Sequence, residues 1–75
     1  MLKKIEQLKP GEHFWSATRG MRGWFACEFW MNNTDSKDYV FPEPWRSDDE
    51  TFRNEDQARV HAIALADSSG LDYVV

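Results

Sequence analysis

The alternation of hydrophobic and polar residues is clearest in "WFACEFWM", Trp24 to Met31, and predicts a β-strand there. Successive side chains of a strand point to opposite sides, so the two sides of this strand differ in character. One side is entirely apolar, with Phe25, Cys27, Phe29 and Met31. The other side carries Trp24, Ala26, Glu28 and Trp30. The preceding "HFWSAT", residues 13–18, predicts a partner strand, and "RGMRG" between the two predicts a hairpin loop.

A helix is predicted from about residue 55 to residue 69. Asn54 is a favourable N-cap, and Gln57, three residues later, completes a capping-box pattern. Gly70 suits the left-handed cap that ends many helices. One side of the helical wheel is small and apolar, with Ala58, Ala62, Leu65 and Ala66, and Ile63 at its edge. Val60 lies away from that side and is expected to be half-exposed, with a contact to another molecule as the alternative.

The remaining segments are shorter. Leu2, Ile5 and Leu8 predict a turn or two of helix that ends at Pro10-Gly11. A loop is expected over residues 32–38, followed by a third strand at residues 39–41 that the prolines of "FPEPW" confine to an edge or stop. The terminal "LDYVV" predicts a last short strand.

These elements indicate a single α+β domain over residues 1–75. We expect a small twisted antiparallel sheet of three to four strands with one helix packed on one face, in the order β-β-β-α-β. The helix is expected to cover the apolar side of the 24–31 strand, which leaves Trp24 and Trp30 facing away from it. Either these two indoles pack under Trp15, Trp45 and the first segment, or they form an exposed aromatic patch. Glu28 lies between them and favours the half-exposed alternative, because a carboxylate is seldom buried without a partner.

Composition and charge limit the function classes. The chain is 41% hydrophobic and 15% aromatic, which is typical of a globular domain. The net charge of −4 is uneven, since residues 1–34 carry +2 and residues 35–75 carry −6. An acidic chain does not bind nucleic acid through its overall charge. With no long apolar run and no signal-peptide pattern, the protein is expected to be soluble and cytoplasmic, with no membrane contact.

Candidates for catalysis or metal binding are few. The histidines, His13 and His61, show no pattern that ties them to Cys27, and they lack the spacing of a zinc site. Cys27 is expected to be a small buried hydrophobe. The acidic Asp48, Asp49 and Glu50 have the oxygens of a cation site but not the spacing of an EF-hand loop. A solvated acidic loop is favoured there, ahead of contact with a basic partner and then of metal. We therefore expect no enzyme, no cofactor and no metal.

The hairpin offers a more specific binding candidate. Arg19 and Arg22 flank Met21, and Trp24 follows closely. Arginine and aromatic residues concentrate binding energy at protein interfaces, and an exposed ring also stacks on nucleic-acid bases. A plain turn, a protein contact and a nucleic-acid contact are all compatible with this pattern. Trp45 is expected to close one end of the core, the alternative being that "FPEPW" presents it on a polyproline-like segment.

The layout of the whole chain resembles that of small inhibitor proteins encoded by phages and mobile elements, of which the anti-CRISPR inhibitors are the best-known group. The shared features are the short acidic domain, the hairpin "HFWSATRGMRGWFACEFWMNN", the capped helix "NEDQARVHAIALADSSG" and the terminal strand. The class shares no motif, so no site is carried over. The resemblance implies stoichiometric binding to a host protein or defence complex in the host cytoplasm, in some cases by imitating nucleic-acid charge.

The favoured hypothesis is therefore a non-enzymatic protein-binding inhibitor, acting as a monomer or homodimer. The alternatives are a small nucleic-acid-binding module that uses the Arg/Trp hairpin, and a structural subunit, for example a homodimer that pairs through Val60 or the edge of the third strand. The expected partner-binding residues are Arg19, Met21, Arg22, Trp24, Glu28, Trp30, Asp48, Asp49 and Glu50.

Overall fold

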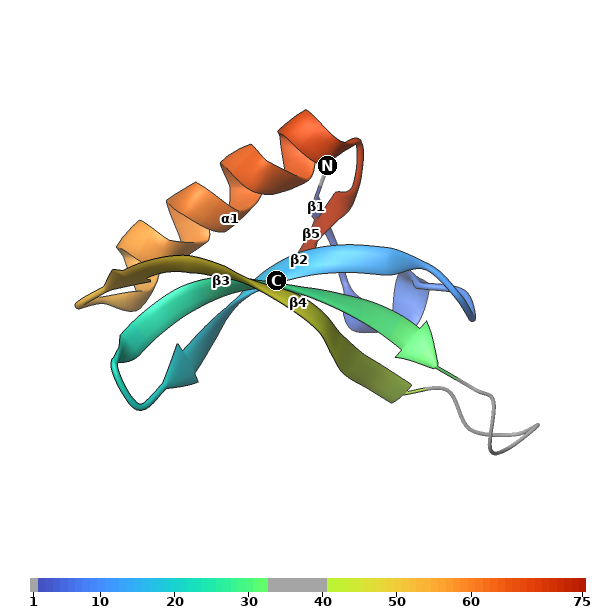
Figure 1. The fold of residues 1–75 in the computed structure, drawn as a ribbon. Helices are drawn as coiled ribbons and strands as arrows, with labels where there is room; N and C mark the ends of the chain where they lie inside the picture. The colour runs from blue at the N-terminus through green and yellow to red at the C-terminus, as the bar shows by residue number, and fades with distance from the viewer. Residues whose placement is uncertain (1, 33–40) are drawn as a thin grey trace.

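The computed structural model describes residues 2–32 and 41–75. Within them lie five strands, one 3₁₀ turn and one α-helix (Figure 1). In chain order these are β1 (Leu2–Lys3), η1 (Ile5–Gln7), β2 (His13–Gly20), β3 (Gly23–Asn32), β4 (Phe41–Phe52), α1 (Glu55–Ser69) and β5 (Asp72–Val74). The expected loop beyond Asn32, and the expected start of the third strand before Phe41, fall outside the described residues.

The described strands form one mixed sheet in the order β1-β5-β2-β3-β4. β2, β3 and β4 are antiparallel neighbours, whereas β5 is parallel to both β1 and β2. This confirms the expected α+β class with one helix packed on a sheet. The sheet has more strands than expected and is mixed, because a crossover through α1 returns the chain in the direction of β4 and places β5 beside β2.

The helix begins and ends as predicted. The Asn54 side chain accepts a hydrogen bond from the backbone N–H of Gln57 at 2.9 Å, and Gly70 has the left-handed conformation with φ of 73°. The backbone N–H of Leu71 then bonds back to the carbonyl of Ala66 at 2.9 Å. Neither α1 nor any other helical segment in residues 2–32 and 41–75 has the length and apolarity that a bilayer crossing needs.

The side of the sheet that α1 covers differs from the prediction. Ala62 and Ala66 pack against Trp15, Ala26 and Tyr73, so the helix lies on the Trp24–Trp30 side of β3 and not on its Phe25–Met31 side. The expectation that the indoles face away from the helix is therefore wrong. The cause is steric: the alanine stripe approaches closest where the sheet also presents a small residue, and Ala26 is that residue.

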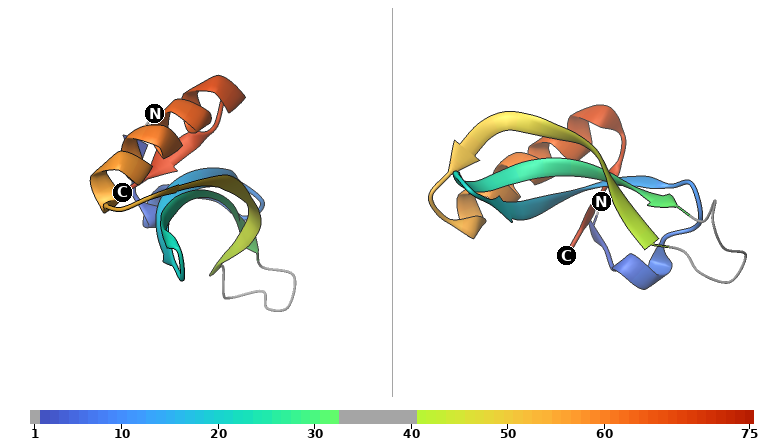
Figure 2. Two further views of the ribbon diagram at one scale, coloured as in Figure 1. Left: turned by 60° about the vertical axis from the view of Figure 1, so that its left-hand side comes forward. Right: turned by 60° about the horizontal axis from the view of Figure 1, so that its bottom comes forward.

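The opposite side of the sheet has its own, smaller cluster. Leu8, Phe14, Met31 and Val74 pack together there, with Phe29 against them. The sheet is arched, with α1 on its convex side (Figure 2). The N-terminal segment is less helical than expected, because Leu2 and Lys3 pair with β5 and only the single turn η1 follows.

The acidic stretch lies in a strand and not in the expected loop. β4 continues through both prolines to Phe52 and forms one edge of the sheet, where a missing N–H donor is tolerated. Its pairing with β3 is irregular in two places. Relative to β3, β4 has one extra residue between Pro44 and Arg46 and two extra residues between Ser47 and Thr51. Such bulges bend a strand and re-aim its side chains.

Candidate functional site

The residues that the sequence grouped into one patch lie in two places. Trp24 and Trp30 are both half-buried and stand six residues apart on β3, which corresponds to about 20 Å along an extended strand. Ala26, between them, is covered by the helix. The hairpin residues therefore cluster with Trp24 at one end of the sheet, and Trp30 belongs to the other end.

At the hairpin end, Arg19 and Trp24 face each other across the β2–β3 ladder. The guanidinium carbon of Arg19 lies 5.9 Å from the centre of the Trp24 ring, a cation–π arrangement. Met21 and Arg22 are exposed at the tip of the turn, and they line a hollow of about 380 Å³ together with Asp48 and Asp49. The structure thus brings the predicted hairpin residues next to two of the predicted acidic ones.

At the other end, Glu28 is buried with partners. Only 5% of its surface is exposed. Nδ1 of His13 donates to one carboxylate oxygen and Nε of Arg46 donates to the other, both at 2.7 Å. The expectation of a half-exposed Glu28 is wrong, because these two donors replace the water that the carboxylate loses.

Four side chains form what we call the aromatic end: His13 and Arg46, which bond to this carboxylate, and Trp30 and Trp45. The ring centres of His13 and Trp45 are 4.9 Å apart, and those of Trp30 and Trp45 are 5.8 Å apart, both edge-to-face. Trp45 is 58% exposed, so it does not close the core as expected. It occupies the first bulge of β4, where the chain presents its indole to solvent.

The contact between Trp30 and Trp45 agrees with the alternative in which Trp30 packs against Trp45, whereas His13 and Arg46 were not expected in this group. One signal was available for His13, since it stands opposite Trp30 if the "RGMRG" hairpin is closed by a two-residue turn. The positions of Trp45 and Arg46 depend on the bulges of β4, which the sequence does not reveal. The guanidinium of Arg46 also lies 5.4 Å from the centre of the Trp15 ring, and this contact ties the aromatic end to the core.

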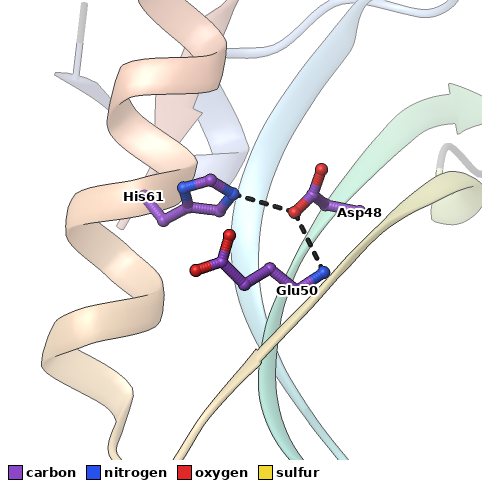
Figure 3. Close-up of side chains that lie close together, drawn as sticks. All are labelled: Asp48, Glu50 and His61. Carbon is purple, nitrogen blue, oxygen red and sulfur yellow. Dashed lines mark hydrogen bonds and ion pairs between the residues drawn. The ribbon is translucent and has the colours of Figure 1, made fainter.

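A second polar group lies between β4 and α1 (Figure 3). Asp48, Glu50 and His61 place one potential ligand atom each within 4.8 Å of one another. Nε2 of His61 donates to the Asp48 carboxylate at 2.8 Å, and this bond holds the pKa of Asp48 below its ordinary value of 3.8. Asp49, between the two acids, points to the other side of the strand and lines the hairpin hollow.

Cys27 is buried on the side of the sheet opposite the helix, in agreement with the prediction of a buried thiol. Burial raises the pKa of its thiol, although the Ser47 hydroxyl donates a bond to the sulfur at 3.8 Å. A thiol held protonated and out of reach of solvent is a poor nucleophile. Cys27 therefore acts as a packing residue.

The described side chains thus converge at the surface in the hairpin hollow, at the aromatic end and in the Asp48–Glu50–His61 group. Comparison of the chain with protein-family models, with curated proteins and with solved structures finds no match.

Proposed function

We propose that this protein is a non-enzymatic protein-binding protein, an inhibitor of the stoichiometric type, and that it contacts its partner through the aromatic end. The observation that carries the proposal is Trp45, an indole that is 58% exposed on an 8.8 kDa domain and is braced by His13 and Trp30. Tryptophan and arginine are the residues that most often dominate protein interfaces. The matching feature on the partner is an apolar pocket that accepts an indole.

The way the patch is held supports this proposal. Glu28 anchors both His13 and Arg46, while Trp30 and Trp45 meet edge to face. Side chains that are already fixed lose less conformational entropy on binding, so more of their contact energy appears as affinity. A rigid aromatic patch with a charged neighbour suits tight binding to one partner better than loose binding to many.

The hairpin end supports binding less well. Arg19 already covers one face of the Trp24 ring. This contact reduces the ring surface that can stack on a nucleic-acid base, and it reduces the freedom of Arg19 to bind a second protein. Arg22 and Met21 remain exposed at the turn. Nucleic-acid binding through the hairpin is the alternative that the experiment distinguishes.

The test is affinity capture from the native host with two matched variants, Trp45→Ala and Met21→Ala, because both side chains are exposed and lie at opposite ends of the sheet. We expect a partner that survives nuclease treatment, is retained by Met21→Ala and is lost by Trp45→Ala. With the purified partner, Trp45→Ala is expected to weaken a 1:1 complex at least about 30-fold, the loss typical of a hot-spot residue.

Three results contradict the proposal in different ways. Loss of capture after nuclease treatment identifies a nucleic-acid ligand, whose binding also weakens steeply with added salt. Loss with Met21→Ala alone moves the protein contact to the hairpin. A light-scattering mass that doubles at high concentration, and returns to the monomer in Trp45→Ala, assigns the aromatic end to self-association.

A further inference from the structure

A mixed-ligand group joins β4 to α1 at a place where the sequence favoured solvated acids and ranked a metal site last. Asp48 and Glu50 are two residues apart, so their side chains leave β4 on the same side, toward the helix (Figure 3). His61, on α1, meets them there, and the three ligand atoms lie within 4.8 Å of one another. The nearest register irregularity of β4 falls in this same stretch, between Ser47 and Thr51.

We propose that Asp48, Glu50 and His61 bind a divalent transition-metal ion, with Zn²⁺ as the reference ion. Two carboxylates and one neutral imidazole balance the charge of a divalent cation. An imidazole nitrogen favours zinc and its neighbours over Mg²⁺ and Ca²⁺, which prefer oxygen alone. Three protein ligands are also the usual number for a zinc ion that keeps one position open.

The geometry needs only a small adjustment to close around an ion. Zinc–ligand bonds of about 2.0–2.2 Å place neighbouring ligand atoms about 3.4 Å apart in a tetrahedron. His61 and Asp48 are already 2.8 Å apart, so their nitrogen and oxygen separate slightly when an ion replaces the shared hydrogen. Glu50 has an exposed side chain, and among the described residues none forms an ion pair with it, so rotation of its side chain brings it into range.

The surroundings hold the histidine and leave the fourth position open. The His61 ring packs against Phe52, with ring centres 5.3 Å apart, which restricts its rotation. A mostly apolar groove of about 530 Å³ runs beside the group between β4 and α1, lined by Phe52, Val60 and Ala64 as well as Glu50 and His61. This groove leaves room beside the group for water or a small ligand.

The test is calorimetric titration of chelator-treated full-length protein with Zn²⁺, followed by Co²⁺ with detection of its visible absorption. We expect saturable 1:1 binding that Glu50→Gln weakens at least tenfold. The matched control is Asp49→Asn, which removes the same charge from the neighbouring position on the other side of β4 and is expected to change the affinity less than twofold. Because Glu50 is exposed, Glu50→Gln keeps the fold intact.

A second readout identifies the nitrogen. In ¹⁵N spectra of the histidine rings, Zn²⁺ is expected to shift Nε2 of His61 and leave His13 unchanged, since His13 is bonded to the buried Glu28. Absence of saturation, equal losses in Glu50→Gln and Asp49→Asn, or equal competition by Mg²⁺ and Ca²⁺ would each overturn the proposal. Partner binding through Trp45 is measured separately, so failure here leaves the proposed function standing.

Discussion

Glu28 shows how one buried side chain sets the shape of a surface. Its two oxygens are each bonded to a side chain that reaches the solvent, His13 on β2 and Arg46 on β4. Three adjacent strands are thereby linked at the aromatic end by one carboxylate. The sequence predicted Glu28 to be part of the contact surface. In the structure Glu28 lies beneath that surface and holds His13 and Arg46, which are part of it, in place.

Replacing Glu28 with Gln is expected to lower the free energy of unfolding by about 1–3 kcal/mol. The amide group of Gln would face either His13 or Arg46 with its NH₂, although both of these groups donate, and the remaining hydrogen bond would lose the carboxylate charge. Urea unfolding followed by tryptophan fluorescence measures this change. The control is Glu6→Gln, an exposed glutamate on η1, for which we expect almost no change. Equal effects of the two substitutions would show that the Glu28 network adds nothing to stability.

Asp48 predicts a specific pH dependence. The bond from His61 lowers its folded-state pKa below 3.8, so the folded protein binds this proton less readily than the unfolded chain does. The resulting stabilisation is present above pH 3.8 and is lost as the pH falls through the lower, folded-state pKa. Wild type and Asp48→Asn should therefore differ in unfolding free energy near neutral pH and converge in acid. A difference that stays constant through the acid range would contradict this origin.

At the scale of elements, the helix was the most predictable part of the chain and its docking the least. Asn54 and Gly70 define its ends through local chemistry that needs no tertiary contact. The choice of sheet face depends instead on Ala26 meeting the alanine stripe, since both sides of β3 carry large apolar groups. Ala26, the only small residue on the Trp24–Trp30 side, was a signal for the correct face. The prediction followed the entirely apolar Phe25–Met31 side instead.

β4 and the His61 contact were unpredictable for a related reason. Prolines and acids in residues 42–50 are typical of a loop, and only its position at the sheet edge allows this segment to be a strand. The pairing of His61 with Asp48 then follows from the path of α1 over β4, a tertiary result with no local signature. The edge position of β4 and the path of α1 over it are both set when the whole sheet assembles, so neither can be predicted from a local stretch of sequence.

The close approach of α1 gives a prediction with a built-in comparison. Ala62 has no exposed surface, whereas Ala64 on the same helix is exposed. Ala62→Leu is expected to cost about 1–3 kcal/mol of unfolding free energy, because the added methylenes force the helix away from Ala26. Ala64→Leu is expected to change it by about 0.5 kcal/mol or less. Thermal unfolding of the two variants tests this, and similar midpoints would mean that α1 is not held closely against the sheet.

At the scale of the whole molecule, β5 joins the two sides of the sheet. It lies between β1 and β2, with Tyr73 in the cluster under the helix and Val74 in the cluster on the opposite side. The Ser16 hydroxyl reaches the carbonyl of Val74 at 3.4 Å, and Lys3 pairs with Asp72 at 3.1 Å. Residues from both ends of the chain therefore meet at this strand, which couples the two clusters into one folding unit.

Removal of residues 72–75 is accordingly expected to abolish the fold and not merely to loosen one end. A 75-residue domain has about 4–11 kcal/mol of stability, and truncating one buried aromatic residue alone costs about 3–5 kcal/mol. Circular dichroism and amide NMR dispersion of the truncated chain should be those of an unfolded protein, while Val75→Ala, which alters an exposed side chain, should match wild type. A truncated chain that keeps its dispersed spectrum would show that β2, β3, β4 and α1 form an independent unit. The aromatic end and the Asp48–Glu50–His61 group, both built on those elements, would then be testable without the C-terminal strand.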